Sequence, residues 1–211
     1  DLAICLDGDA DRVVILDELG NEIDGDQLIA LIAKNLKSEN KIHGNTIVST
    51  VMSNLGLLRY LKDLGLSLYR TPVGDRYVSE IMKEKGFNFG GEKSGHIIMT
   101  DYSSTGDGLL AALYFLSILK DSGKTTSQLL NIFEPTPQKL LNLSFRSKNN
   151  PLENPEFQKT INELRKQISD NGEILVRKSG TEPVIRIMIQ HHDPKIFEQI
   201  LEEINYKLSK L

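Results

Sequence analysis

Residues 46–90 read TIVSTVMSNLGLLRYLKDLGLSLYRTPVGDRYVSEIMKEKGFNFG and decide the fold class. Short runs of apolar and β-branched residues alternate here with segments whose apolar residues recur at helical spacing. The pattern predicts a strand, a helix, a strand, a helix and a strand over residues 46–50, 55–64, 67–70, 75–85 and 87–90. Strands that alternate with helices are typical of an α/β layer with parallel strand pairing.

The segment before this stretch predicts a further strand pair and a helix. Two apolar runs, residues 2–6 and 13–16, flank an acidic loop and indicate a strand, a loop and a strand. From Asp24 to Leu36 apolar residues recur at helical spacing, and Asp24 is a suitable N-cap. The chain enters its first strand-like run directly at Asp1 without an initiator Met, which favours a fragment of a longer protein.

The segment after this stretch predicts a buried helix, a linker and a second domain. Residues 109–119 are the most apolar helical segment and leave little polar face, so we expect that helix to be buried between layers. Residues 134–137 read EPTP, which cannot continue a helix and predicts a linker. A strand, a helix, two strands and a helix follow over residues 140–146, 157–168, 173–176, 184–190 and 195–208, which indicates a small α+β domain.

Composition restricts the class of protein. The 211 residues carry a net charge of −4, with 39% hydrophobic and 26% charged residues, as is typical of soluble globular domains. No apolar run approaches the roughly 20 residues of a membrane-spanning helix, and the acidic balance argues against nucleic acid as a partner. Cys5 is the single cysteine, so we expect it to be a small buried hydrophobe in a reducing, cytoplasmic setting.

The acidic loop DGDADR places Asp7, Asp9 and Asp11 at alternate positions between the first two apolar runs. Converging carboxylates repel one another unless a cation is bound, and an all-oxygen ligand set favours Mg²⁺ or Ca²⁺. Glu18 stands where an EF-hand loop has its bidentate carboxylate, but Arg12 occupies the position of the required glycine and the flanks are strand-like. A metal site and an ordinary solvated acidic turn are the two interpretations of this loop.

The loop GGEKSGH, residues 90–96, brings a carboxylate, a hydroxyl and an imidazole together at the end of a predicted strand. Glu92 can accept hydrogen bonds from neighbouring sugar hydroxyls, Ser94 can donate or accept, and His96 can donate or transfer a proton near neutral pH. These groups suit a polyhydroxyl ligand, and the alternative is a tight turn with polar surface residues. We expect surface or packing roles for the other histidines, His43, His191 and His192.

The segment RKSGTEP, residues 177–183, connects two predicted strands and is followed by Arg186. It gathers guanidinium, ammonium and hydroxyl groups around a glycine that permits a backbone bend, which suits a phosphate cradle because Arg donates to phosphate in a planar, two-pronged way. The spacing of a Walker A loop is absent. The alternative interpretation is a basic β-hairpin.

In this order the three loops resemble the signatures of the α-D-phosphohexomutase superfamily, and residues 71–78 and 104–108 resemble its glucosamine branch. Asp75 argues against the sister phosphomannomutase/phosphoglucomutase branch, which usually carries His at that position. The resemblance covers essentially the whole chain, but it corresponds only to the C-terminal part of the family's four-domain architecture. The phosphorylated serine of the family's first domain has no equivalent in this sequence.

The resemblance implies a partial α/β domain, a complete three-layer α/β domain of mixed sheet and a small α+β (TBP-like) C-terminal domain. Residues 1–40 would be the remnant of the family's second domain with its metal-binding loop. Residues 41–137 would be the third domain with the sugar-binding loop, and residues 138–211 the phosphate-binding domain.

The same resemblance implies an enzyme that interconverts glucosamine 6-phosphate and glucosamine 1-phosphate. The reaction would pass through a phosphoserine enzyme and a bisphosphorylated sugar, on the route to UDP-N-acetylglucosamine and cell-wall precursors. Mg²⁺ would be held by Asp7, Asp9 and Asp11. The substrate would be bound by Glu92, Ser94, His96, Arg177, Ser179, Gly180, Thr181 and Arg186. Arg12 and His96 are possible assisting residues in catalysis, with binding favoured for His96.

Three expectations follow for the chain taken by itself. Without the phosphoserine we expect no mutase activity from these residues alone. A sister mutase acting on glucose or mannose phosphates and a non-catalytic phosphosugar-binding module are the alternative functions. The partial domain would leave strand edges without partners, so it either packs on the third domain or associates between copies.

Overall fold

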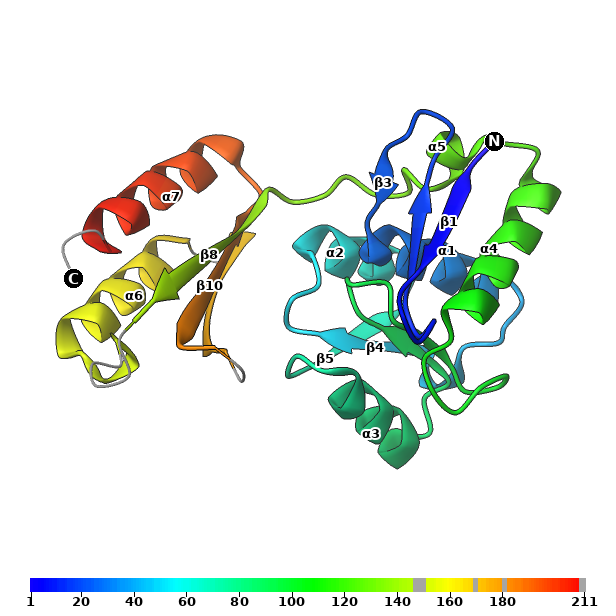
Figure 1. Ribbon diagram of the computed structural model, residues 1–211, viewed down its shortest axis with the longest axis horizontal. Helices are drawn as coiled ribbons and strands as arrows, with labels where there is room; N and C mark the ends of the chain where they lie inside the picture. The colour runs from blue at the N-terminus through cyan, green and yellow to red at the C-terminus, as the bar shows by residue number, and fades with distance from the viewer. Residues whose placement is uncertain (146–150, 169–170, 180–181, 209–211) are drawn as a thin grey trace. The chain divides into compact units, whose positions relative to one another are not determined.

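The computed structural model describes residues 1–145, 151–168, 171–179 and 182–208, and these form two compact units. Unit 1 is Asp1–Pro135 and unit 2 is Thr136–Leu211 (Figure 1). The division falls within residues 134–137, where the two prolines interrupt regular structure. Each unit has its own hydrophobic core.

The central sheet of unit 1 is mixed, with strand order β5-β4-β6-β7. β4 (Thr46–Thr50) pairs in parallel with β5 (Ser67–Thr71) and with β6 (Phe89–Gly91). β7 (Ile97–Met99) pairs antiparallel with β6. The expected α/β layer with a mixed sheet is therefore confirmed, and β7 is a strand that the sequence pattern did not predict.

Helices cover both faces of this sheet, which gives three layers. α1 (Gly25–Ser38) and α2 (Leu55–Asp63) pack in the main core, whereas α3 (Asp75–Lys85) packs with Val48 and Ile98 on the other face (Figure 1). Asp24 caps α1, as its sequence position predicts, because its side chain accepts a hydrogen bond from the Asp26 N–H. A single turn, η1 (His43–Asn45), precedes β4.

A second, antiparallel sheet in unit 1 has the order β1-β2-β3. Its strands are β1 (Ala3–Leu6), β2 (Val13–Leu16) and β3 (Glu22–Ile23). The expectation that Cys5 is buried was wrong, because Cys5 is exposed. β1 is an edge strand in which Ile4 packs against the core, so the neighbouring Cys5 points to the opposite face of the pleat.

The most apolar helix, α4 (Gly108–Ser122), is buried on one face only. Ala111, Ala112 and Phe115 lie in the core, but Leu109 and Leu113 are 53% and 57% exposed. The expectation of a helix buried all round was therefore wrong. α4 contacts β1, β2 and α1, and its buried residues form a stripe at helical spacing, whereas the leucines outside that stripe remain exposed among the described residues. A short helix, α5 (Thr126–Leu129), follows.

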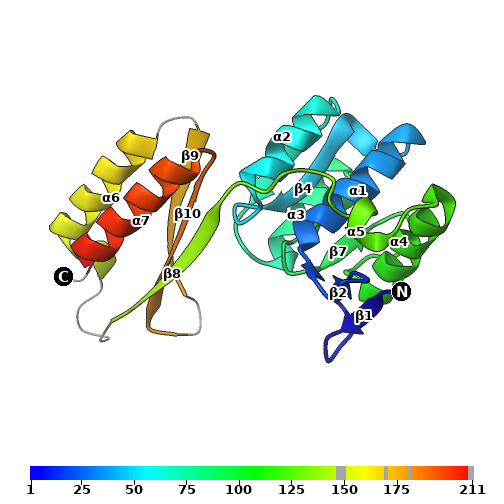
Figure 2. The same ribbon diagram turned by 90° about the horizontal axis from the view of Figure 1, so that it is seen from above.

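Unit 2 is an antiparallel sheet with helices on one face. Its strands are β8 (Gln138–Ser144), β9 (Gly172–Lys178) and β10 (Val184–His191), in the order β8-β10-β9. α6 (Pro155–Ile168) and α7 (Pro194–Leu208) lie side by side over that face (Figure 2), and a single turn, η2 (Pro151–Glu153), precedes α6. The predicted α+β arrangement is confirmed. None of the helices in the described ranges is long and apolar enough to cross a membrane.

Candidate functional site

The acidic loop lies between β1 and β2 and brings its three aspartates together. One carboxylate oxygen from each of Asp7, Asp9 and Asp11 lies within 4.8 Å of the others. The loop turns through Ala10, whose φ of 58° is left-handed, and the Arg12 N–H lies 3.2 Å from Asp7 Oδ1, to which it donates. Alternate positions therefore converge because the backbone reverses between them.

The oxygens of this loop fit a divalent cation. Asp11 Oδ1 is buried and has no hydrogen-bond partner within the described part of the chain, and Arg12 Nε lies 3.8 Å from it. A buried carboxylate oxygen without a partner is costly, and a bound cation would satisfy it. Because every available donor is a carboxylate oxygen, the loop suits Mg²⁺ or Ca²⁺ better than a thiophilic metal.

The loop of residues 90–96, called the sugar loop after its predicted ligand, joins β6 to β7 and is held by its own backbone. The Glu92 N–H donates to the His96 carbonyl over 2.8 Å, and the Gly95 N–H donates to the Glu92 carbonyl over 3.0 Å. Glu92 is buried, and its Oε1 accepts a hydrogen bond of 3.0 Å from the Gly74 N–H. Ser94 is exposed at the tip of the loop. The carboxylate is thus oriented by a neighbouring loop, while the hydroxyl faces solvent.

The acidic loop, residues 7–12, called the metal loop below after its predicted ligand, forms one cluster with the sugar loop. The Val13 N–H donates to the Gly95 carbonyl over 3.1 Å, and Arg12 forms a β-bridge with His96. Gly95 has a φ of +87°, and a Cβ at this position would overlap the Val13 carbonyl oxygen. His96 Nδ1 lies 3.2 Å from Asp11 Oδ2. Backbone and side chains therefore join two loops that are far apart in the sequence.

A third segment, residues 106–108, closes this cluster from the side of α4. The Gly108 N–H donates to the Ala10 carbonyl over 2.9 Å, and the Asp107 N–H donates to the Ile97 carbonyl over 3.2 Å. Asp107 also caps α4 by accepting a hydrogen bond from the Leu110 N–H. In the sequence these residues support only the family resemblance. Their structural role depends on contacts that no local pattern reveals.

Two further carboxylates near the sugar loop were missed in the sequence analysis. Asp24 Oδ2 forms an ion pair of 2.6 Å with Lys93 Nζ. Asp26 is fully buried, and its Oδ2 accepts a hydrogen bond of 2.8 Å from the Asn54 N–H. Burial, and next the negative charge of Asp24, raise the pKa of Asp26 to about 7. The signal available in the sequence was an acidic pair, DGD, at the start of a helix.

The predicted phosphate loop lies in unit 2 between β9 and β10. Arg177 and Arg186 are directly paired across these strands, so both side chains emerge on the same face of the sheet. Arg186 Nη2 lies 3.1 Å from Glu182 Oε2, and the buried Ser179 donates its N–H to the Val184 carbonyl over 2.8 Å. Two more of the predicted ligands, Gly180 and Thr181, lie outside the described residues.

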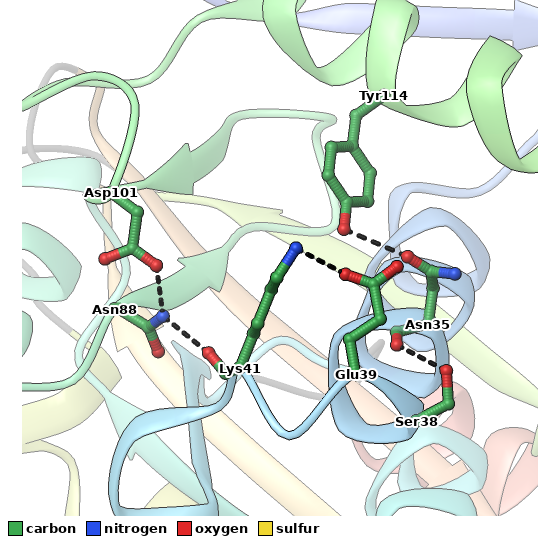
Figure 3. Close-up of polar contacts among 7 residues, drawn as sticks. All are labelled: Asn35, Ser38, Glu39, Lys41, Asn88, Asp101 and Tyr114. Carbon is green, nitrogen blue, oxygen red and sulfur yellow. Dashed lines mark hydrogen bonds and ion pairs between the residues drawn. The ribbon is translucent and has the colours of Figure 1, made fainter.

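A polar cavity of about 450 Å³ lies elsewhere in unit 1, between the ends of α1 and α4. Its polar groups pair with one another: Lys41 Nζ lies 2.7 Å from Glu39 Oε2, and the Tyr114 hydroxyl donates to Asn35 Oδ1 over 2.9 Å (Figure 3). Burial raises the pKa of Tyr114 to about 12. None of the predicted site residues lines this cavity.

Comparison with protein families gives two matches. Residues 24–136 match the model described as phosphoglucomutase/phosphomannomutase, alpha/beta/alpha domain III. Residues 140–206 match the model described as phosphoglucomutase/phosphomannomutase, C-terminal domain. The first match includes the sugar loop, and the second includes the phosphate loop.

Curated relatives match almost the whole chain. Proteins named phosphoglucosamine mutase from Ruegeria sp. (strain TM1040) and Roseobacter denitrificans are 50% and 51% identical over 204 residues. These alignments cover 97% of this chain and 46% and 45% of the relatives. The chain therefore spans about half the length of the curated relatives it matches.

Solved structures share the fold. A phosphoglucomutase/phosphomannomutase family protein from Burkholderia thailandensis has a TM-score of 0.79 and 23% identity, over 100% of this chain and 46% of its own. The N-acetylphosphoglucosamine mutase of Aspergillus fumigatus, solved with GlcNAc-6P and magnesium, has a TM-score of 0.77 and 20% identity, over 99% of this chain and 52% of its own. At these identities the likeness establishes the fold alone.

Proposed function

Because this chain belongs to the phosphoglucomutase/phosphomannomutase family, we propose that it supplies the metal, sugar and phosphate loops of an enzyme that interconverts glucosamine 6-phosphate and glucosamine 1-phosphate. The observation that carries this proposal is the cluster in which the acidic loop is joined to the sugar loop through Val13–Gly95 and Asp11–His96. The choice of glucosamine rests on the roughly 50% identity to proteins named phosphoglucosamine mutase.

In this proposal Asp7, Asp9 and Asp11 hold Mg²⁺. The ion would supply positive charge beside the transferring phosphoryl group, where negative charge is spread over the equatorial oxygens. Arg12, which ends the metal loop and is half-exposed, would add a second positive charge there. The buried Oδ1 of Asp11, which has no hydrogen-bond partner among the described residues, supports this assignment.

The sugar-binding residues of this proposal belong to unit 1, and the phosphate-binding residues belong to unit 2. Glu92, held in place by the Gly74 N–H, would accept hydrogen bonds from sugar hydroxyls, and Ser94 would donate or accept from the exposed loop tip. His96 is a further candidate contact. The phosphate ligands of this proposal are Arg177, Ser179, Gly180, Thr181 and Arg186.

The domain assignment of 1–40, 41–137 and 138–211 belongs to the same proposal, as does a cytoplasmic location. The phosphoryl donor in it is a phosphoserine that is not among these residues, so the chain alone binds substrate without turning it over. Self-association through the exposed edge of β1 is the partner interaction we propose besides the phosphosugar.

Calorimetric titration of glucosamine 6-phosphate into the chain, with Mg²⁺ present, tests this proposal. We expect binding by the unmodified chain and a loss of at least about tenfold in affinity for Arg177→Ala/Arg186→Ala, because each guanidinium makes charge-assisted hydrogen bonds to phosphate. The matched control is Lys159→Ala/Lys195→Ala, which removes two exposed charges from the helices of unit 2. Equal losses in both pairs would reject the phosphate site.

Two further measurements separate the alternatives. Tighter binding of glucose or mannose 6-phosphate than of glucosamine 6-phosphate would favour the sister mutases. A turnover assay of the chain alone, free of host enzyme, should give no glucosamine 1-phosphate. Appreciable turnover would contradict the requirement for a phosphoserine outside these residues.

A further inference from the structure

We propose that His96 is a positioning residue of the metal site: its imidazole fixes one oxygen of Asp11 so that the other is presented to the cation. This inference rests on the proposed metal site of Asp7, Asp9 and Asp11. It assigns the sugar loop a second task, because the residue that ends this loop would also set the geometry of the metal loop.

The position of His96 supports this role. The side chain is 4% exposed, and its Nδ1 lies 3.2 Å from Asp11 Oδ2. The backbone bridge between Arg12 and His96 brings the two chain segments together, so the contact does not depend on two flexible side chains meeting by chance. A buried donor held by the backbone loses little conformational entropy when it binds its acceptor.

The opposite edge of the imidazole ring is confined by Gly106. A Cβ at this position would overlap Cε1 and Nε2 of His96, so only a glycine leaves room for the ring. The Cε1–Nε2 edge therefore faces Gly106, while Nδ1, at the other side of the ring, lies 3.2 Å from Asp11 Oδ2. This packing explains a glycine that is otherwise required neither by a positive φ nor by a turn.

The two oxygens of Asp11 have different surroundings. Oδ2 is the oxygen near His96, while Oδ1 is buried without a hydrogen-bond partner within the described part of the chain. A donor on Oδ2 would fix the carboxylate plane and leave Oδ1, which accepts no hydrogen bond within the described residues, available to the cation. One carboxylate oxygen of Asp11 lies within 4.8 Å of an oxygen of Asp7 and an oxygen of Asp9. Groups that orient metal ligands in this way commonly change metal affinity about 10- to 100-fold when they are removed.

Binding of Mn²⁺, followed by electron paramagnetic resonance of the free ion, tests the proposal on the whole chain. We expect His96→Ala to weaken Mn²⁺ binding about 10-fold or more. His96→Asn should retain affinity to within about threefold, because the asparagine amide nitrogen takes the place of Nδ1 as the donor. His43→Ala removes an exposed histidine outside the cluster and should leave the affinity unchanged.

A measurement on the unmodified chain tests the proposal even if the variants do not fold. Long-range ¹H–¹⁵N spectra of the His96 ring should show a proton on Nδ1, since only that form donates to Asp11. A bare Nδ1 with the proton on Nε2 would overturn the proposal, as would equal Mn²⁺ affinity in a folded His96→Ala variant. If the unmodified chain failed to bind Mn²⁺ at all, the metal site itself would be rejected, and the role of His96 with it.

Discussion

The metal and sugar loops of unit 1 differ from the phosphate loop of unit 2 in what holds them in place. The first two are held by contacts between segments far apart in sequence: Val13–Gly95 and Asp11–His96 join them to each other, and Ala10–Gly108 joins the metal loop to the start of α4. The phosphate loop is a hairpin connection whose two arginines are aligned by the register of adjacent strands. Both regions are short polar loops in the sequence, but only one of them depends on the whole unit around it.

A substitution should therefore affect folding in the first region and binding alone in the second. In the cluster of unit 1, backbone segments approach so closely that a single methyl group would overlap a neighbouring carbonyl. In the hairpin of unit 2, Arg177 and Arg186 are partly exposed, and Arg186 forms its ion pair with Glu182 of the same hairpin. We therefore expect losses of stability in the first region and losses of ligand affinity in the second.

The largest expected effect is that of Gly95→Ala. The residue has a φ of +87°, and its new Cβ would overlap the Val13 carbonyl oxygen. Left-handed strain and overpacking against rigid backbone together should lower the free energy of unfolding of unit 1 by about 3–5 kcal/mol. Urea denaturation followed by circular dichroism measures this change.

Gly20→Ala is the matched control for that experiment. Gly20 has a similar φ of +83°, but its Cβ would meet no atom within 4 Å. It should cost only the strain of the left-handed backbone, about 1–2 kcal/mol. Equal losses for the two variants would show that the close approach between the loops contributes nothing.

The fold was largely predictable, because it depends on local periodicity. The alternating strands and helices of residues 46–90 and the N-cap at Asp24 follow from patterns within a few residues of one another. β3 and β7, of two and three residues, are too short to carry a pattern. Cys5 and Leu113 were placed wrongly because apolar character does not say which face of an element meets a neighbour.

The site was predictable only in part, for the same reason. The spacing of Asp7, Asp9 and Asp11 is local, and it indicated their convergence. The contact of Asp11 with His96 and the ion pair of Asp24 with Lys93 join distant segments, and no spacing reveals them. The glycines at these crossings, Gly95 among them, were the available signal, but a glycine alone does not identify its neighbour.

The second largest effect concerns pH and the buried carboxyl of Asp26. Its pKa is raised to about 7 when folded, against 3.8 for an ordinary aspartate. The folded chain then holds the proton more tightly than the unfolded chain. The contribution of the Asp26 carboxyl to the free energy of unfolding is therefore most favourable below about pH 4 and declines as pH rises to about 7. Asp26→Asn should remove that decline, which amounts to as much as about 4 kcal/mol.

Urea denaturation at pH 4, 6 and 8 measures the difference between Asp26→Asn and the unmodified chain. The variant should gain relative stability with rising pH. Asp17→Asn provides a control of opposite sign, because hydrogen bonds from Asn21 lower the pKa of Asp17, so that its favourable contribution is lost as pH falls. A pH-independent difference for Asp26→Asn would contradict the assignment of a raised pKa.

The third effect lies in unit 2 and should appear in binding rather than in folding. Arg186→Gln removes one charge-assisted donor from the phosphate loop, and we expect affinity for glucosamine 6-phosphate to fall about 10-fold or more. The free energy of unfolding should change by less than about 1 kcal/mol, because the ion pair of Arg186 with Glu182 is partly exposed. Arg165→Gln, which removes a donor to the Ile174 carbonyl, is the control that should spare affinity.

The smallest effect is the most specific test of the hairpin. Glu182 Oε2 lies 3.1 Å from Arg186 Nη2, so in the proposed site it would compete with a phosphate for the same donor. Glu182→Gln removes that competing charge, so affinity for glucosamine 6-phosphate should rise by about two- to fivefold, the range of an exposed ion pair. The free energy of unfolding should shift by no more than about 0.5 kcal/mol. Calorimetry resolves this change, and weaker binding instead would mean that Glu182 orients Arg186 for the phosphate, which would make the hairpin a preorganised site like the cluster of unit 1.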